Sequence, residues 1–211
     1  MAGGILEQLR GAEGGMDQKT IAAYDRAAKN FSDEWRDQPP PQDMYDLFLS
    51  LLGPGRTVDI GCGSGRDAAW LTQQGHQVLG VDASVQMIAE AKRRFPETEF
   101  LVGVLPQLEV LGLELFDNVV CETVIMHLPI ESMGPAVRRL LSLIRPAGVL
   151  YLSWRVSAES SRDTHGRLYQ AFDDQIIMLE LVQCESLYDA KLISESSGRE
   201  VRRIAVRKKF I

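Results

Sequence analysis

The chain has 211 residues, of which 45% are hydrophobic and 25% are charged, so it is long enough to bury the core of one ordinary globular domain. Its formal net charge of −6 argues against a nucleic-acid partner, because neutralising phosphates requires an excess of Lys and Arg. No apolar run approaches the roughly 20 residues that span a bilayer, and the first residues lack the basic and apolar segments of a secretory signal. We therefore expect a cytoplasmic protein with no membrane partner.

The segment before residue 54 is predicted to differ from the rest. Five glycines within the first 15 residues disfavour a helix, so residues 1–15 are expected to be flexible. Apolar residues then recur at helical spacing over residues 16–35 and again over residues 43–52. We interpret residues 16–53 as a helical lid in front of a core at residues 54–211, within a single domain.

Strand-like and helix-like patterns alternate through the core. Strands are expected at residues 56–63, 76–83, 98–105, 116–128 and 148–154, and helices at residues 65–75, 84–95 and 130–146. Apolar strands that alternate with helices predict a doubly wound, Rossmann-like α/β fold with a mostly parallel sheet. The tail differs, because a helix over residues 167–183 is followed by an antiparallel hairpin of residues 186–195 and 200–210.

A glycine-rich loop follows the first core strand in "VDIGCGSG". Asp59 precedes Gly61, Gly63 and Gly65, and in a doubly wound sheet the ligand binds beyond the carboxyl ends of the strands, against this first turn. A nicotinamide fingerprint requires G-x-G-x-x-G, but Arg66 occupies the position of its third glycine. The spacing therefore weakens the prediction of a dinucleotide.

A second carboxylate ends the next strand in "VLGVDAS". Asp82 is placed where an ionised side chain accepts hydrogen bonds from the two hydroxyls of a ribose. The alternative is that Asp82 only caps the following helix. Ser84 is able to supply that cap itself, which favours the ribose interpretation.

Together, "VDIGCGSG", "GVDAS" and "FDNVVCETVIMHL" resemble the motifs of class I S-adenosylmethionine-dependent methyltransferases, and the C-terminal hairpin is similar to the antiparallel seventh strand of that family. The resemblance implies S-adenosylmethionine as cofactor, S-adenosylhomocysteine as product, no metal, and a small-molecule acceptor bound by a monomer or homodimer. Many relatives carry an aspartate after the third strand, where this sequence has Val104 and Leu105. The cofactor-binding residues implied are Asp59, Gly61, Cys62, Gly63, Gly65, Arg66, Asp82, Ala83, Met87, Val104, Leu105 and Glu122.

In-line methyl transfer requires mainly proximity and alignment, and a base where the acceptor atom carries a proton. His127, just past the fourth strand, is either that base or a partner of the loop backbone. Tyr24, in the first helix, resembles a tyrosine often found in the lid of the family. It either contacts cofactor or substrate or anchors its helix, and both residues are candidates for catalysis. Substrate-binding candidates are Trp35, His127, Trp154 and Arg155.

Several charged groups leave alternatives open. Arg66 pairs either with the carboxylate of the cofactor or with a neighbouring acid such as Asp67, and Glu122 either meets the amino group of the cofactor or is solvated. Arg155, Arg162, His165 and Arg167 follow the fifth strand, where they either bind an anionic substrate or are neutralised by nearby acids. The basic run from Arg199 to Lys209 is interpreted as a solvated strand edge.

Two rival functions remain. A protein with this cofactor loop that has lost transfer activity would act as a sensor or partner subunit, and a nicotinamide oxidoreductase would bind NAD instead. Cys62, Cys121 and Cys184 are not spaced as metal ligands, and we expect them to be reduced thiols.

Overall fold

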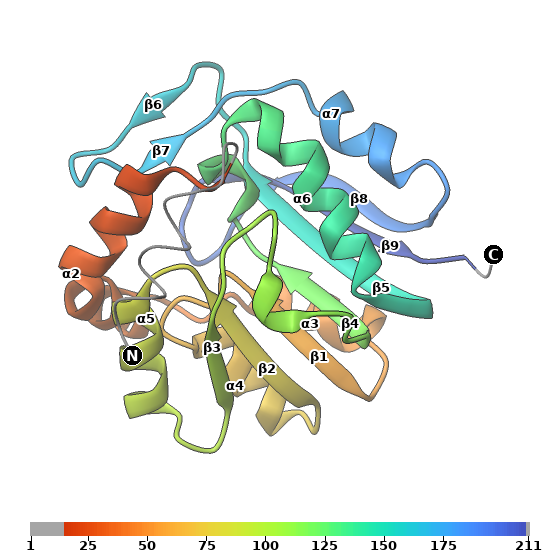
Figure 1. Cartoon of the computed structure of the whole chain (residues 1–211), viewed down its shortest axis with the longest axis horizontal. Coiled ribbons are helices and arrows are strands. Elements are labelled where there is room, and N and C mark those ends of the chain that lie inside the picture. Colours follow the sequence, from red (N-terminus) through yellow and green to blue (C-terminus); the bar gives the residue numbers. More distant parts are fainter. Residues whose placement is uncertain (1–14, 210–211) are drawn as a thin grey trace.

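The computed structural model describes residues 15–209, which form one central sheet with helices on both faces (Figure 1). The segment expected to be flexible, residues 1–15, lies outside the described residues except for its last position. Within residues 15–209, no helix has both the length and the apolar character needed to cross a membrane.

The sheet has seven strands in the order β3-β2-β1-β4-β5-β9-β8. Strands β1 to β5 are parallel, whereas β9 pairs antiparallel with β5 and β8 pairs antiparallel with β9. This confirms the predicted doubly wound fold with a C-terminal hairpin. The strands are β1 (Arg56–Ile60), β2 (Gln77–Asp82), β3 (Glu99–Val102), β4 (Phe116–Cys121), β5 (Ile144–Arg155), β8 (Glu185–Ile193) and β9 (Glu200–Arg207).

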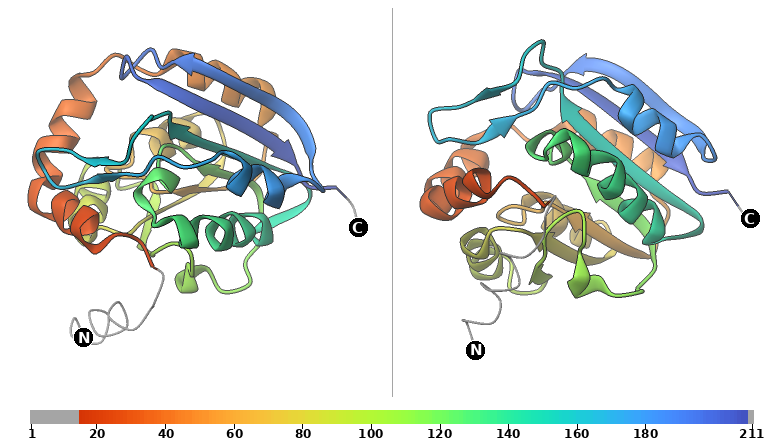
Figure 2. Two further views of the ribbon diagram at one scale, coloured as in Figure 1. Left: turned by 90° about the horizontal axis from the view of Figure 1, so that it is seen from above. Right: turned by 45° about the horizontal axis from the view of Figure 1, so that its top comes forward.

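Helices cover both faces of the sheet (Figure 2). The helices are α2 (Gln18–Asp37), α3 (Gln42–Leu51), α4 (Arg66–Gln73), α5 (Val85–Arg94), α6 (Ile130–Ser142) and α7 (Gln175–Met178), with 3₁₀ turns η1 (Glu109–Leu111), η2 (Ile125–His127) and η3 (Leu179–Leu181). Buried side chains of α6, α7 and η1 share one apolar cluster with β1, β4 and β5. Buried side chains of α3 and α4 pack on the opposite face.

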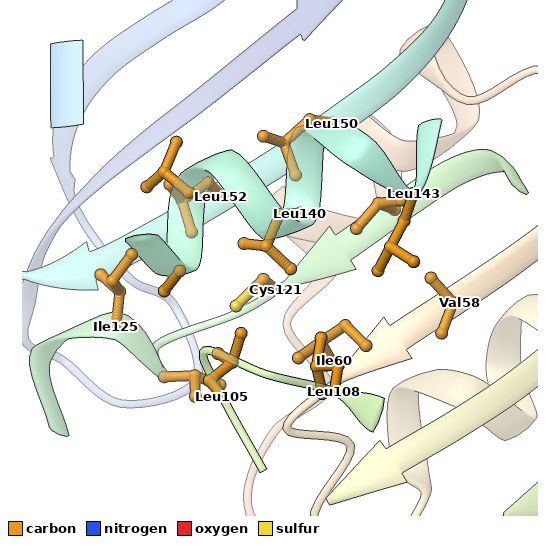
Figure 3. Close-up of a cluster of buried hydrophobic side chains, with 14 of the residues drawn as sticks. Val58, Ile60, Leu105, Leu108, Cys121, Ile125, Leu140, Leu143, Leu150 and Leu152 are labelled. Carbon is orange, nitrogen blue, oxygen red and sulfur yellow. The ribbon is translucent and has the colours of Figure 1, made fainter. Parts of the chain in front are cut away.

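The core under α6 fixes the strand ends that carry the functional loops. In Figure 3, Leu140 of α6 lies among Ile60 of β1, Cys121 of β4 and Leu152 of β5. These side chains are fully or almost fully buried. Burial of each Leu or Ile side chain among them contributes roughly 1.5–3 kcal/mol of transfer free energy. The loops that follow β1 and β4 are therefore attached to a rigid base.

The segment predicted as a lid, residues 16–53, contains two helices that pack against different parts of the molecule. Helix α2 packs against α5, whereas α3 buries Met44, Tyr45 and Phe48 in the cluster on the sheet. The turn between them lies at residues 38–41, which include three consecutive prolines. Helix α3 thus packs as part of the core layer, and α2 is the element of residues 16–53 that lies away from the sheet (Figure 1).

Three predicted elements differ from the structure. The strand expected over residues 116–128 ends at Cys121 and continues as a loop and η2, and the helix expected to reach residue 146 ends at Ser142 so that β5 begins at Ile144. The helix expected over residues 167–183 forms only in part, as α7 and η3 at residues 175–181. Its first residues instead form β7 (Leu168–Tyr169), which pairs with β6 (Ser161–Arg162), because the Leu168 N–H donates to Thr20 Oγ1 at 2.8 Å and tertiary contacts override helix propensity.

The basic run near the C-terminus is not a solvated edge throughout. Strand β9 lies between β5 and β8, and Arg203 is only 1% exposed. Arg203 Nη1 donates to Asp43 Oδ2 of α3 at 2.8 Å. The buried arginine thus joins α3 to the sheet, which the sequence pattern did not indicate.

Candidate active site

A cavity lies at the carboxyl ends of β1, β2 and β4. Its glycine-loop end is formed by Asp59, Gly61, Gly63, Asp82 and Glu122. Its histidine end is formed by Tyr24, His127, Arg155, Arg167 and Tyr169. The two ends therefore draw their charged and aromatic groups from different parts of the chain.

The glycine loop adopts backbone conformations that L side chains rarely take. The φ angles of Gly61, Gly63 and Gly65 are 78°, 53° and 86°, in the left-handed region that glycine enters without steric penalty. A Cβ atom on Gly63 would lie 2.7 Å from Cζ3 of Trp35. The loop therefore needs glycine for its own turn and for the indole that α2 lays against it.

Asp82 holds the glycine loop and the start of α5 together. Its Oδ2 accepts from the Gly63 N–H at 2.9 Å and its Oδ1 accepts from the Ser84 N–H at 2.8 Å. Ser84 Oγ caps α5 by accepting from the Met87 N–H at 3.1 Å. Burial raises the pKa of Asp82 to about 6 although its backbone hydrogen bonds oppose the shift,.

Two further carboxyl groups, those of Asp59 and Glu122, lie at the glycine-loop end. Asp59 is 3% exposed, and its Oδ2 has no hydrogen-bond partner among the described residues. Glu122 accepts from Tyr151 Oη at 2.6 Å and from Ser153 Oγ. Burial raises the pKa of both Asp59 and Glu122, as expected for carboxylates that are removed from water.

Arg66 lies in the same region but is paired with its neighbour. Its Nε donates to Asp67 Oδ1 at 2.9 Å, and Asp67 Oδ1 also accepts from Tyr45 Oη at 2.8 Å. Of the two partners considered for Arg66, Asp67 is therefore the one with which it forms an ion pair in the structure. The three remaining carboxylates of this end, Asp59, Asp82 and Glu122, form no ion pair within residues 15–209.

The histidine end contains a hydrogen-bonded pair from distant segments. His127 Nδ1 contacts the Leu168 carbonyl, and Nε2 lies 3.2 Å from Tyr24 Oη. A carbonyl oxygen only accepts, so Nδ1 carries the proton and Nε2 accepts from the tyrosine hydroxyl. Burial lowers the pKa of His127 to about 4 and raises the pKa of Tyr24 to about 12, so both are neutral at pH 7.

Two arginines border this pair: Arg155, the last residue of β5, and Arg167, from the connection that follows it. Arg167 donates to Asp163 at 2.7 Å and stacks 4.3 Å from the Phe31 ring centroid. The Arg155 guanidinium lies 5.0 Å from the centroid of Tyr169. Arg162 and His165, which were grouped with them, are not part of the cavity lining, and Arg162 instead pairs with Asp17 at 2.8 Å.

Most of the other candidates line the cavity, and two do not. Residues of the lining include Trp35, Cys62, Ala83, Met87 and Leu105. Val104 instead packs beside the main apolar cluster. Trp154 is 2% exposed and its Nε1 donates to Asp174 at 3.0 Å, so it supports the segment around α7 and does not reach the cavity.

Sequence patterns gave no indication of three contributors. Tyr169 and Met126 line the histidine end, but each fell in the part of a predicted helix or strand that does not form. Asp25 of α2 accepts from Ser84 Oγ at 2.6 Å and from the Gln86 N–H at 3.1 Å. A carboxylate from α2 thus meets the N-terminus of α5, and no local motif marks such a contact.

Residues 57–148 match the sequence model of a family described as methyltransferase domain. This part of the chain therefore resembles a methyltransferase domain. The match spans the glycine loop and Asp82 and runs to the start of β5, so the glycine-loop end of the cavity lies inside it. This favours the methyltransferase interpretation over the nicotinamide one.

Curated relatives of this chain are named for different acceptors. A trans-aconitate 2-methyltransferase of Rhodopseudomonas palustris is 34% identical over 124 residues, which covers 57% of this chain and 45% of that protein. A malonyl-[acyl-carrier protein] O-methyltransferase of Enterobacter lignolyticus is 28% identical over 133 residues, which covers 63% and 52%. The chain spans about half the length of these curated relatives.

Solved structures show the same fold at low identity. A S-adenosylmethionine-dependent methyltransferase from Anabaena variabilis has a TM-score of 0.70 at 16% identity and covers 92% of this chain and 97% of its own. The 1,6-didemethyltoxoflavin-N1-methyltransferase of Burkholderia thailandensis, solved with its substrate and S-adenosylhomocysteine, has a TM-score of 0.69 at 22% identity and covers 91% and 88%. The chain therefore shares the architecture of these proteins.

Proposed function

We propose that the protein transfers a methyl group from S-adenosylmethionine to a small molecule. The observation that carries the proposal is a set of three carboxylates around the glycine loop: Asp59, which is buried, and Asp82 and Glu122, which are partly buried. Buried or partly buried carboxylates without a cationic partner favour a cationic ligand. S-adenosylmethionine offers an ammonium and a sulfonium, together with ribose hydroxyls that donate hydrogen bonds.

The residues present fit this cofactor. Asp82 supplies the acceptor for the ribose hydroxyls, the unpartnered Oδ2 of Asp59 accepts from a donor of the methionine part, and Glu122 adds negative charge toward the ammonium. Met87 and Leu105 supply apolar surface for the adenine, since no aspartate follows β3. When bound, the cofactor supplies a methyl group that is already activated by the positive sulfur.

The histidine end would receive the acceptor. Transfer to an activated methyl group depends on alignment, which contributes roughly 7–11 kcal/mol in favourable cases. His127 Nε2 carries no proton at neutral pH and lies 3.2 Å from the Tyr24 hydroxyl oxygen. We assign this pair to the removal of a proton from the acceptor, a role that typically contributes about 10²–10⁴-fold in rate.

The acceptor we propose is small and anionic. Arg155 and Arg167 line the histidine end, and arginine presents a planar fork that suits carboxylates and phosphates. Curated relatives include enzymes named for trans-aconitate and for malonyl-[acyl-carrier protein], which is consistent with an acid as acceptor.

Product formation tests the proposal. Purified protein is incubated with methyl-labelled S-adenosylmethionine and the dialysable fraction of a cell extract, and we expect label in a new small molecule. Asp82→Asn, which removes the charge of the ribose acceptor, is the matched control and should give less label when the cofactor concentration is limiting. Cofactor binding measured by calorimetry without any labelled product would instead support an inactive sensor, and stabilisation by NAD but not by S-adenosylhomocysteine would overturn both.

A further inference from the structure

We propose that the acid group of the acceptor is an anchor and not the methylated atom: the anion binds Arg155, and the methyl group goes to a separate, neutral O–H or N–H of the same molecule. The product therefore keeps its negative charge. This inference rests on the proposed methyl transfer and specifies its substrate class.

Arg155 is the arginine of the cavity lining that we assign to binding an anion. It lines the cavity, and it forms no ion pair with any carboxylate of residues 15–209. Its neighbour Arg167 differs, because Asp163 already neutralises it at 2.7 Å. A half-buried arginine without a counter-ion favours the binding of a carboxylate or phosphate, to which its guanidinium donates two parallel hydrogen bonds.

The anchor and the base border the same aromatic ring. The Arg155 guanidinium lies 5.0 Å from the centroid of Tyr169, and the His127 ring lies 5.1 Å from it. One small molecule lying against Tyr169 therefore reaches both groups. An anion on Arg155 places the rest of that molecule beside the Tyr24 hydroxyl and His127.

The base argues against the anion as the nucleophile. A carboxylate carries no proton at neutral pH and needs no base, and a bidentate ion pair with Arg155 would lower the nucleophilicity of its oxygens. The backbone carbonyl of Leu168 holds His127 in the tautomer whose Nε2 accepts from the Tyr24 hydroxyl, and burial lowers the pKa of His127 to about 4, so the imidazole stays neutral. A prepared base is useful only to a nucleophile that must lose a proton.

The step balances with the groups at hand. The oxygen or nitrogen of the acceptor forms a bond to the methyl carbon as the bond from that carbon to the sulfonium sulfur breaks, which leaves a neutral thioether. The proton of the acceptor passes to Tyr24 Oη while the hydroxyl proton of Tyr24 passes to His127 Nε2. The imidazolium then returns the proton to solvent, and the anionic anchor is unchanged.

The charge and stability of the labelled product test this inference. The methyl-labelled small molecule from the extract assay is applied to an anion exchanger at neutral pH and then treated with alkali. We expect the label to be retained by the exchanger and to resist alkali, as for an ether or N-methyl group. A labelled product that flows through, or that releases labelled methanol in alkali as a methyl ester does, overturns the inference and leaves the methyl transfer standing.

Variants locate the anchor on Arg155. Arg155→Met should raise the KM of the purified acceptor at least tenfold, since hydrogen bonds to a charged group contribute about 1.5–3 kcal/mol, with S-adenosylhomocysteine affinity unchanged. Arg155→Lys should recover part of the loss, because it keeps the charge. The control is Arg138→Met, an exposed arginine of α6 paired with Glu180, and an equal KM in Arg155→Met and Arg138→Met overturns the assignment.

Failure of the inference is distinguishable from failure of the proposed function. Tyr24→Phe should lower kcat with little change in KM, because only the proton path is interrupted. If no labelled product forms with the unaltered protein, the methyl transfer itself fails and the inference falls with it. If a product forms at the same kcat in Tyr24→Phe, methyl transfer stands and the proton path is wrong.

Discussion

The two ends of the cavity differ in charge and in how the chain builds them. The glycine-loop end gathers buried or partly buried acids from the ends of three neighbouring parallel strands, where Asp59, Asp82 and Glu122 are held by the sheet beneath them. The histidine end gathers Tyr24, His127 and Arg155 from three segments with no shared strand pairing. The comparison teaches that the fold itself presents the proposed cofactor site, whereas the proposed acceptor site depends on how α2 and the β6–β7 hairpin pack against each other.

The contacts at the histidine end illustrate this dependence. Helix α2 is tied to the hairpin by Thr20, which accepts from the Leu168 N–H at 2.8 Å, and by the Asp17–Arg162 pair at 2.8 Å. Leu168 in turn fixes the tautomer of His127. The hairpin therefore orients the base through its backbone, and side-chain substitutions at Leu168 leave that carbonyl in place.

The largest expected effect comes from blocking the glycine-loop end. Gly63→Val places a side chain where a Cβ would already lie 2.7 Å from Trp35, at a φ of 53°. We expect S-adenosylhomocysteine affinity to fall by about 100-fold or more, since the penalty for an L side chain in this region adds to the clash. Calorimetry measures the affinity, and circular dichroism checks that the sheet still forms.

Gly53→Val is the matched control, because a Cβ there meets nothing within 4 Å. The double variant Gly63→Ala with Trp35→Ala separates the two causes. If removal of the indole restores binding, the clash with α2 dominates, and if it does not, the backbone strain does. Normal affinity in Gly63→Val would contradict the placement of the cofactor against this loop.

The contrast between the two ends also marks the limit of sequence reasoning. Asp59, Gly63 and Asp82 stand in short local motifs at strand ends, so their meeting at one edge of the sheet followed from the alternation of strands and helices. Tyr169 and Asp25 act through contacts with segments far away in the sequence, such as Asp25 with Ser84 at 2.6 Å. No periodicity records such contacts, because tertiary packing selects them after the local elements have formed.

The prediction that Trp154 binds substrate was also wrong, because the sequence did not specify which face of the sheet its side chain points to. A tryptophan at the end of β5 was expected to reach the substrate, but successive strand residues point to opposite faces, and Trp154 faces the α7 segment, where it meets Asp174. The next residue, Arg155, lines the cavity. A shift of one residue at the end of a strand therefore determines whether a side chain enters the core or the cavity. The sequence of β5 is apolar on both faces, so it did not indicate which side chain would reach the cavity.

A smaller effect is expected from the charge of Asp82. Asp82→Asn keeps the size of the side chain but removes the anionic acceptor, and we expect cofactor affinity to fall about tenfold, since hydrogen bonds to charged groups contribute about 1.5–3 kcal/mol. Calorimetry with S-adenosylhomocysteine at pH 7.5 measures the loss. The control is Ser84→Ala, which removes the cap of α5 and should lower stability by about 1 kcal/mol while affinity is kept.

The pH dependence of binding sharpens the same test. Burial raises the pKa of Asp82 to about 6 from 3.8, so the carboxylate is lost as the pH falls below about 6, and affinity should fall with it. The sign for stability is opposite: because the folded-state pKa exceeds the unfolded value, Asp82 favours the folded protein below pH 3.8 and loses this contribution as the pH rises through about 6,. Affinity that is independent of pH between 5 and 8 would show that Asp82 does not act through its charge.

The smallest expected effect distinguishes the two helices before the core. Helix α2 contributes Tyr24 and Trp35 to the cavity lining, whereas α3 buries its apolar face against the sheet and is joined to β9 by the Asp43–Arg203 pair at 2.8 Å. If α2 is the lid, bound ligand should oppose its local opening and leave α3 unaffected. Hydrogen exchange measured with and without S-adenosylhomocysteine should therefore slow several-fold in residues 18–37 and remain unchanged in residues 42–51. Equal slowing in both helices would mean that residues 16–53 respond as one unit, as the sequence first suggested, and no slowing in α2 would mean that the cofactor enters and leaves without moving it.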